Sequence, residues 1–325
     1  MSKSSNKIPF MPTIIEHAAA IINQTPSAAA RDADLMAKAH IQAYNLYHQD
    51  AVTVGMDVYN IEAEALGCQV RLYEDNSIPG ILTHPLTLES DPGSIIFSAN
   101  LGRIQLVLDA ATQVKATIGS DTRVSVGICG PFSVLIELLG FEAAIHAFID
   151  EDERVGPLLN AVLEFQKEYA SAIASRGLGI TVFESWASPP LITPDIYKEY
   201  TLPYQQGLFG HLKILGLAAT PLVIGGDTRP ILDLILESGT TLLVSDYNTP
   251  LDLYVQKAKT KGLSLRANID PKLVSRGDFD AIEARVNEIY AQQETYPKLI
   301  IGTGVVPYDT PQANLLRVRD MIVSG

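Results

Sequence analysis

The hydrophobic positions of this sequence fall into two kinds of segment that alternate along the chain. The first kind consists of short runs of Val, Ile and Leu that end at Gly, Asp, Asn or Ser. Unbroken apolar runs of this length are typical of parallel strands buried on both faces. Seven runs predict strands at residues 51–57, 124–130, 179–185, 221–226, 241–247, 263–270 and 298–304. An eighth run, at residues 93–98, is less clear.

Between these runs, apolar residues recur with the period of a helix. This period predicts helices at residues 152–174, 193–215, 228–238 and 278–293. Pro194 and Pro230 suit the first turns of two of these helices, and Thr193 and Thr228 could cap the same two ends. Strands and helices therefore alternate along most of the chain.

Seven or eight strand–helix units favour one α/β architecture. Over residues 51–325 they fit a single (β/α)8 TIM barrel better than a doubly wound sheet. The first fifty residues predict extra N-terminal helices that lie across the outside of the barrel. Because no linker, charge block, low-complexity tract or repeat divides the chain, residues 1–325 are expected to form one domain.

The composition limits the kinds of partner. The formal net charge is −13, and no basic stripe offsets it, so a nucleic acid partner is not expected. Cys68 and Cys129, the two cysteines, cannot form a disulfide framework or a four-thiolate zinc site, and they are predicted to be small buried hydrophobic residues.

The N-terminal segment does not have the pattern of a signal peptide. Its mildly apolar stretch is interrupted by Pro12, Glu16 and His17. No run approaches the roughly 18 uninterrupted apolar residues that a transmembrane helix needs. A cytoplasmic protein without a membrane partner is therefore predicted.

The candidate chemistry lies at the predicted strand ends, since the carboxyl ends of the strands carry the active site of a TIM barrel. The residues at those ends are Asp57, Gly130, Glu184, Ser185, Gly225, Gly226, Asp227, Ser245, Asp246, Arg266, Asn268, Gly302 and Gly304. Several acids are thus expected to converge with one arginine, and this cluster is a better candidate site than any single motif.

Purely structural roles are open for the same residues. Asp57 could cap the helix that follows it, and Asp227 could cap the helix predicted at residues 228–238. Glu184 and Arg266 could pair only with each other, because a charge after an apolar strand is costly unless it is paired or used. Two residues could simply form loops at strand ends: Asp246 and Asn268.

Other motifs are weak or missing. None of the histidines follows a predicted strand, and the chain has no HxH, HExxH or CxxC, so a zinc site with His or Cys ligands has little support. The sequence GTGVVP at 302–307 is not a dinucleotide fingerprint, and neither a GxSxG elbow nor a P-loop occurs.

Three stretches together resemble the uroporphyrinogen decarboxylase superfamily. They are DAVTVGMDVYNIEAEALGCQVRLYEDNSIP (50–79), GPFSVLIELLG (130–140) and VFESWASPPLITPDIYKEYTLPY (182–204). ANIDP at 267–271 and the Gly-rich end with Thr310 and Pro311 extend the likeness, which covers residues 50–325 in order. The resemblance implies a TIM barrel. It also implies one of two chemistries, which are porphyrinogen decarboxylation and methyl transfer involving a cobalamin on a separate corrinoid protein.

The decarboxylase pattern is only partly present. Asp57 matches the aspartate that holds the pyrrole N–H groups in that family, and Ser185 also matches. The arginine-rich N-terminal motif for the substrate carboxylates is missing, since no arginine precedes Arg31. The family's tyrosine in the Gly-Pro segment falls on Glu137, and its late histidine falls on Thr303. Porphyrinogen decarboxylation is therefore not favoured.

The stretch PLVIGGDT at 221–228 separates this chain from the thiol-using methyltransferases of the superfamily. Those enzymes carry His-x-Cys-Gly at this strand end and a late Cys, and their zinc activates a thiol. The corresponding residues here are Val223, Gly225, and Thr303 or Gly304. Gly225 and Gly226 are interpreted first as space for a ligand, next as turn glycines, and last as a phosphate cradle.

The remaining chemistry is demethylation of a small donor, most plausibly an aryl methyl ether, by Co(I) of a partner corrinoid protein. Glu184 and Glu199 enclose fourteen residues, a spacing that resembles carboxylate-type zinc sites in ether-cleaving relatives. Thr220 stands where the histidine of that site is expected, so zinc stays undecided.

The predicted site has two parts. Asp57, Glu184 and Asp246 would supply the acid or metal-binding group. Arg266 and Asn268 would orient the substrate. Further substrate contacts are expected from Asn60, Ser185, Gly225 and Gly226. The alternatives are a decarboxylase-like enzyme acting on a smaller substrate and a non-catalytic barrel that binds a tetrapyrrole or a partner.

Overall fold

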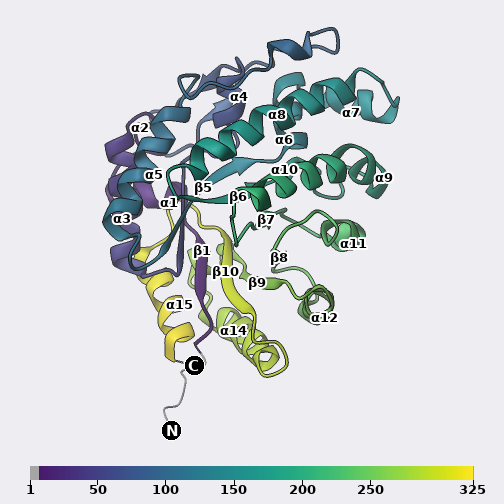
Figure 1. Cartoon of the computed structure of the whole chain (residues 1–325). Coiled ribbons are helices and arrows are strands. Elements are labelled where there is room, and N and C mark those ends of the chain that lie inside the picture. Colours follow the sequence, from purple (N-terminus) through teal and green to yellow (C-terminus); the bar gives the residue numbers. More distant parts are fainter. Residues whose placement is uncertain (1–6, 325) are drawn as a thin grey trace.

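A computed structural model describes residues 7–324 of the chain. Eight parallel strands surround a common axis (Figure 1). They are β1 (Phe10–Thr13), β2 (Ala51–Val54), β5 (Arg123–Cys129), β6 (Gly179–Phe183), β7 (Leu222–Val223), β8 (Leu242–Ser245), β9 (Ser264–Ile269) and β10 (Leu299–Val305). The hydrogen-bonded orders are β1-β10-β9-β8 and β2-β5-β6-β7.

Backbone contacts join the two groups of strands at both seams. Between β1 and β2, the amide of Asp50 donates to the carbonyl of Phe10 at 2.9 Å. Between β7 and β8, the amide of Thr241 donates to the carbonyl of Thr220 at 3.3 Å, and Pro221 forms a parallel bridge with Leu242. The strands therefore follow one another around a barrel, and the predicted TIM fold is confirmed.

Helices surround the strands. The longer ones are α3 (Ala33–Tyr47), α5 (Ile104–Ile118), α8 (Val155–Ala174), α10 (Leu202–Ile214), α12 (Leu251–Lys261), α14 (Phe279–Gln293) and α15 (Gln312–Ser324). The shorter ones are α1 (Glu16–Ile21), α2 (Pro26–Ala30), α4 (Ile61–Ala65), α6 (Pro131–Leu139), α7 (Phe141–Ile149), α9 (Pro194–Ile196), α11 (Leu232–Ile235) and α13 (Pro271–Arg276). A small hairpin, β3 (Val70–Arg71) with β4 (Gly80–Ile81), lies in the segment after α4.

The eighth strand is not where the sequence placed it. Residues 93–98 form no strand, since Pro92–Ser94 is a 3-10 turn capped by Asp91, and Ile96 is 65% exposed. The missing strand is β1, inside the N-terminal segment that was expected to be only helical. Its four residues include Pro12, so its apolar pattern is too short and too broken to stand out. The helices α1 to α3 of that segment are present as predicted.

The predicted helices are present with shifted ends. Residues 193–215 divide into α9, the π-helical turn η3 (Tyr197–Thr201) and α10. The Thr193 hydroxyl caps α9 by accepting from the amide of Ile196 at 3.2 Å. Thr228 does not cap with its side chain, because its hydroxyl pairs with Tyr254 Oη at 2.7 Å.

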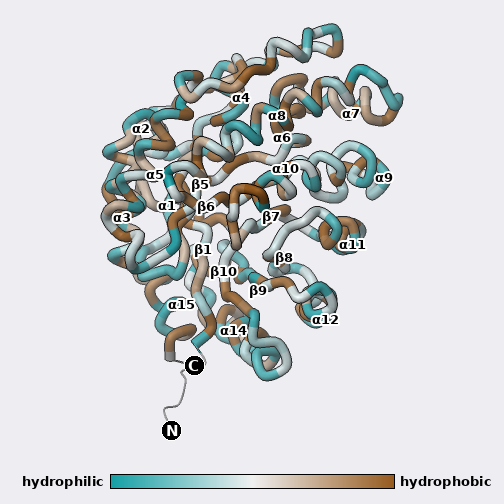
Figure 2. Tube along the Cα trace, viewed as in Figure 1, coloured by the Kyte–Doolittle hydropathy of each residue, from teal (hydrophilic) through white to brown (hydrophobic). Residues whose placement is uncertain are grey.

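Apolar side chains are buried on both sides of the sheet. The larger core lies between the strands and the helices. A smaller cluster of Ile15, Val58 and Phe183, with Tyr59 and Val223 against it, lies near the carboxyl ends of the strands. Hydrophobic colour gathers around β6, while polar colour marks α9 and α12 on the outside (Figure 2).

Within residues 7–324, no single helix has the length and apolar character to cross a membrane. The sharply bent pair α6 and α7 meets that criterion only when the two helices are taken together.

Candidate active site

A cavity of about 210 Å³ lies at the carboxyl ends of the barrel strands. Its lining comes from Thr13 of β1, Tyr59 after β2, and the ends of β6 to β10. Six residues of the predicted site line it: Ser185, Gly225, Gly226, Asp246, Arg266 and Asn268. The carboxyl ends of the predicted strands therefore supply part of the cavity wall, including its charged residues.

Arg266 and Asn268 alternate with apolar residues along β9, so both face the barrel interior. Arg266 is 7% exposed, its Nε is buried without a hydrogen-bond partner, and its side chain makes no ion pair with a described residue. Burial lowers the pKa of Arg266 to about 10, and the nearby Asp246 acts against that shift. At neutral pH the cavity wall thus carries an unpaired cation. Oδ1 of Asn268 is also buried without a partner.

Gly302 gives these two side chains their room. A Cβ on Gly302 would lie 2.7 Å from Cδ of Arg266 and 2.8 Å from Oδ1 of Asn268. The sequence pattern places Gly302 only among the residues at a predicted strand end. A glycine inside an apolar strand is itself a signal of close approach by a neighbouring group.

Asp246 lies nearer the mouth of the cavity than Arg266. The strand register pairs Val244 with Arg266, so Asp246 is two residues further along, which is about 6–7 Å toward the carboxyl end. Its Oδ2 accepts from the amide of Gly226 at 2.6 Å, and its Oδ1 accepts from the amide of Tyr247 at 2.7 Å. Burial raises the pKa of Asp246, and these backbone bonds act against the rise. Asp246 is therefore a fixed carboxyl group whose pKa lies above that of an exposed aspartate.

The two glycines of PLVIGGDT have different structural roles. A Cβ on Gly225 would meet nothing within 4 Å, so this position leaves open space on the cavity wall. Gly226 has φ +78°, a conformation that favours glycine, and its amide faces Asp246. The first glycine makes room, and the second makes the turn that anchors the acid. Asp227 accepts from the amide of Arg229 at 3.1 Å, in keeping with its predicted capping role.

An aromatic wall stands opposite the polar residues. Tyr59 and Phe183 meet edge to face with ring centroids 6.0 Å apart, and the Tyr59 hydroxyl is hydrogen-bonded to the Ser185 hydroxyl. Such a wall suits an aromatic ring or a methyl group. Tyr59 was not among the predicted site residues, although it is an aromatic residue just after the strand predicted at residues 51–57.

Asp57 and Asn60 do not belong to the cavity lining among the described residues. Arg103 grips Asp57 with two bonds, from Nη1 to Oδ1 at 2.8 Å and from Nη2 to Oδ2 at 2.7 Å. Nδ2 of Asn60 donates to Oδ2 of Asp57 at 2.9 Å and to the carbonyl of Pro79 at 2.7 Å. Asp57 also does not cap the following helix, whose N-cap position is Asn60. Both carboxylate oxygens are occupied by this buried network, which corrects the expectation that Asp57 faces the cavity.

The side chain of Glu184 likewise points away from the cavity, toward the helices outside the barrel. Phe183 and Ser185 face the cavity, so the residue between them points outward. Its Oε1 accepts from the amide of Ser133 at 2.8 Å, at the start of α6, and its Oε2 accepts from Gln205 at 3.4 Å. Burial raises the pKa of Glu184 to about 7. Glu184 is not paired with Arg266, so that alternative is wrong as well.

The residues present do not fit a metal centre. Glu184 is fully buried whereas Glu199 is exposed, which does not support the carboxylate pair considered from the sequence. At the places of the thiol-activating ligands stand Val223, Gly225, and Thr303 or Gly304. In the part of the chain that the structure describes, no three His, Cys, Asp or Glu side chains gather as a metal site. No chemical step is assigned to a resident metal here.

Both cysteines are buried and free, as predicted. Cys68 donates to the carbonyl of Glu137 at 3.3 Å, and Cys129 donates to the carbonyl of Val58 at 3.4 Å. Burial raises the pKa of both thiols, so neither favours a thiolate.

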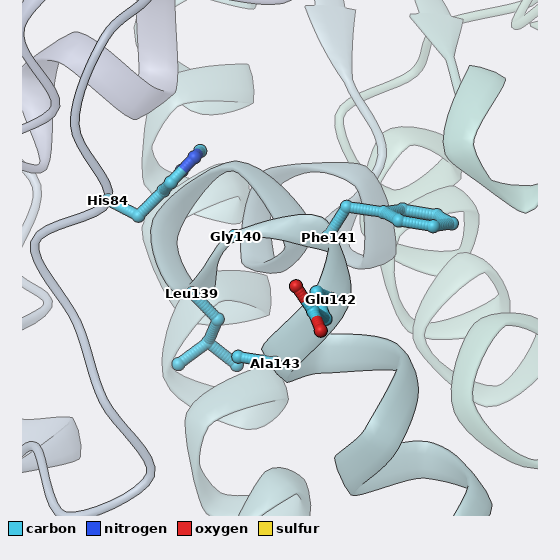
Figure 3. A pocket seen from close by; sticks show the side chains of 6 residues that line it. All are labelled: His84, Leu139, Gly140, Phe141, Glu142 and Ala143. Carbon is cyan, nitrogen blue, oxygen red and sulfur yellow. The ribbon is translucent and has the colours of Figure 1, made fainter.

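A second, open hollow of about 530 Å³ lies at the turn between α6 and α7. It is lined by His84, Leu139, Gly140, Phe141, Glu142 and Ala143 (Figure 3). None of these residues lies at the end of a barrel strand. The hollow is therefore separate from the strand-end chemistry.

Known proteins match the chain over most of its length. The family model for uroporphyrinogen decarboxylase (URO-D) matches residues 2–324. A methylcobamide:CoM methyltransferase, MtbA of Methanosarcina mazei, is 28% identical over 296 residues, which are 90% of this chain and 85% of the relative. A uroporphyrinogen decarboxylase of Pelodictyon phaeoclathratiforme is 25% identical over 294 residues, which are 86% of this chain and 81% of the relative.

The fold also matches a solved structure, a methyltransferase from Methanosarcina mazei. The TM-score is 0.81 at 23% sequence identity, and the match covers 97% of this chain and 94% of the other. At this identity the likeness establishes the shared fold.

Proposed function

The chain belongs to the uroporphyrinogen decarboxylase family, and on that premise we propose that it demethylates a small aryl methyl ether and delivers the methyl group to a corrinoid protein. Methyltransferases of this family match the chain over most of its length, in agreement with the predicted enzyme class. The acceptor in this proposal is Co(I) of a cobalamin carried by the partner. We take residues 1–325 as one domain that acts in the cytoplasm, where free thiols such as those of Cys68 and Cys129 persist.

The observation that carries the proposal is the composition of the small cavity. It combines one fixed carboxyl group, one unpaired arginine and an aromatic wall, while the thiol-activating positions hold Val223, Gly225, and Thr303 or Gly304. A thiol acceptor would need a group that lowers its pKa. An ether donor needs instead an acid for its leaving oxygen.

The chemistry assigned to this chain is positioning and proton donation. The donor ring lies against Tyr59 and Phe183, with its ether oxygen beside Asp246. Co(I) of the corrinoid protein supplies the nucleophile for the methyl carbon. As the carbon–oxygen bond breaks, the oxygen keeps the electron pair and takes the proton of Asp246 to give the free phenol. The rise in the pKa of Asp246 on burial favours the protonated form that this step needs.

Decarboxylation is the second candidate, because a uroporphyrinogen decarboxylase is among the relatives. Two features disfavour it. Asp57, which matches the pyrrole-holding aspartate, is occupied by Arg103 and Asn60. The cavity of about 210 Å³ lies below the roughly 300–1,000 Å³ typical of sites for larger ligands. A barrel that only binds a tetrapyrrole meets the same obstacle of size.

The test is a single-turnover assay with the purified chain, a reduced corrinoid protein from the same organism and a methoxylated phenol. Methylation of the corrinoid, followed by absorbance, should accompany release of the phenol. Asp246→Asn should slow this step by roughly 10²–10⁴, the usual contribution of a positioned acid. If CO₂ is released from a porphyrinogen and no methyl ether or methylamine reacts, the decarboxylase alternative replaces the proposal.

A further inference from the structure

We propose that the methyl donor carries a carboxylate at the end opposite its methoxy group, and that Arg266 binds this carboxylate at the floor of the cavity. The inference rests on the proposed function and narrows it, because it names the class of aryl ether.

The first observation is that Arg266 is buried without a counter-ion. Arg103 is buried to the same degree, with 8% of its surface exposed against 7% for Arg266. Arg103 nevertheless forms ion pairs with Asp57 at 2.7 Å and with Glu64 at 2.5 Å. The side chain of Arg266 forms no ion pair with the described residues, and its Nε is buried without a hydrogen-bond partner. A buried charge in this state is costly, so the side chain is suited to an anion that enters from outside.

The second observation is that the nearest acid is already occupied. Asp246 is the carboxylate that influences Arg266 across the cavity. Its two oxygens accept from the amides of Gly226 and Tyr247, and these backbone bonds hold the group in place. No ion pair joins Asp246 to Arg266 within the described chain. The guanidinium therefore keeps its donors for a ligand, and Gly302 leaves the space that this conformation needs.

The third observation is the difference in depth between the two groups. Arg266 is level with Val244, and Asp246 is about 6–7 Å closer to the mouth. A carboxylate bound at Arg266 directs the rest of a flat ligand toward Asp246 and the open end. A methoxy group placed para to that carboxylate then lies beside the acid, at the end from which a corrinoid partner can approach. Binding of the carboxylate at Arg266 therefore places the methoxy group in the orientation that the reaction requires.

The experiment compares 4-methoxybenzoate with its neutral analogue 4-methoxybenzamide. Binding is measured by calorimetry without any corrinoid, and demethylation is measured with free cob(I)alamin as acceptor. The wild-type chain should bind the carboxylate about 10–100-fold more tightly than the amide, as expected for charge-assisted bonds to arginine. Arg266→Gln should abolish this preference by weakening the carboxylate alone, and Arg266→Lys should restore part of it. With 2-methoxybenzoate, binding should persist while methyl transfer slows.

Arg229→Gln is the matched control. Arg229 is an exposed arginine at the same end of the barrel, where it pairs with Asp227, and it does not line the cavity. Its removal should leave the preference for the carboxylate unchanged. Equal binding of the two compounds by the wild-type chain, or an unchanged preference in Arg266→Gln, would overturn the inference. Demethylation of the amide with a loss in Asp246→Asn would then still support the proposed function. Arg266-dependent binding without any methyl transfer would uphold the anion site and reject the reaction.

Discussion

At the residue scale, Arg103 and Arg266 are two nearly inaccessible cations in opposite circumstances. Arg103 connects Asp57 and Glu64, whereas Arg266 faces a cavity without a partner. Removing one partner of a buried ion pair strongly destabilises the folded state, because the other charge stays buried alone. A buried charge without a partner lowers the stability of the folded state by its whole desolvation penalty. The same chemical group is thus part of the folded scaffold in one place and a feature of the site in the other.

This contrast predicts opposite effects on stability. Arg103→Met should lower the free energy of unfolding by about 3–5 kcal/mol, because Asp57 is left buried without its partner. Arg266→Met should leave the free energy of unfolding unchanged or raise it by up to about 2 kcal/mol. Urea denaturation of both variants measures the difference. A loss in Arg266→Met as large as that in Arg103→Met would mean that Arg266 is structural.

The role of Asp246 predicts a pH dependence. Burial raises its pKa, so the protonated fraction at a given pH exceeds that of an exposed aspartate. Because the protonated form donates to the leaving oxygen, the rate of methyl transfer should fall as the pH rises through this raised pKa. Asp246→Asn should lose that part of the pH profile. A profile that is identical in wild type and variant would remove Asp246 from the step.

At the scale of elements, the first turn of α6 is held by a side chain at the end of a barrel strand. Glu184 at the end of β6 accepts from the amide of Ser133 in the first turn of α6, where the positive end of the helix favours a carboxylate. Gly130 at the end of β5 lies directly against this carboxyl group. A Cβ there would be 1.6 Å from Oε2 of Glu184. The glycine and the glutamate therefore form one structural unit.

Gly130→Ala should accordingly lower the free energy of unfolding by about 1–3 kcal/mol, because Glu184 is fully buried and cannot move aside easily. The double variant Gly130→Ala, Glu184→Ala should lose less than the sum of the two single variants. Gly210→Ala is the control, since a Cβ at that position in α10 meets nothing within 4 Å and should not destabilise the helix. Strict additivity in urea denaturation would contradict the proposed contact.

The strand pattern made much of this arrangement predictable from the sequence. The unbroken apolar runs located seven strands, and their carboxyl ends placed Ser185, Asp246, Arg266 and Asn268 on the cavity wall. The alternation of side chains along a strand separates Glu184 from its neighbours Phe183 and Ser185, whereas position at a strand end alone places all the acids in one cluster.

Other features depend on contacts between distant parts of the chain. The partner of Asp57 lies 46 residues away at Arg103, and no local pattern connects them. The strand β1 has only four residues, one of them Pro12, and it is recognisable chiefly by its pairing with β10. The open space at Gly225 and the close approach at Gly302 depend on side chains of neighbouring strands. Such features follow from packing, so the sequence pattern alone does not contain them.

At the scale of the whole molecule, three glutamates are buried with raised pKa values. Burial raises the pKa of Glu16 and of Glu184 to about 7 and that of Glu62 to about 8. Glu62 accepts from the amide of Cys129 at 2.8 Å, and its other oxygen has no partner. In addition, the chain carries a formal net charge of −13 near neutral pH. As the pH rises, ionisation of these buried groups and repulsion among the surface acids both lower the free energy of unfolding.

The last prediction is that this protein is more stable at mildly acidic pH than at pH 8. In the unfolded chain these carboxyls lose their protons near pH 4.5, whereas in the folded chain they lose them near pH 7 or 8. Between these values the folded state binds more protons, so the free energy of unfolding falls as the pH rises. For Glu62, the whole shift corresponds to roughly 5 kcal/mol.

Glu62→Gln removes one of the ionisations and should flatten the fall in stability between about pH 5 and pH 8, with the gain over wild type largest at pH 8. Glu199→Gln makes the same chemical change at an exposed position and should leave the slope nearly unchanged. Urea denaturation of the three proteins at a series of pH values gives the comparison. If stability instead rises from pH 5 to pH 8 in the wild-type chain, the buried glutamates are ionised and stabilised by partners, and the polar network around Glu62 has a different charge from the one inferred here.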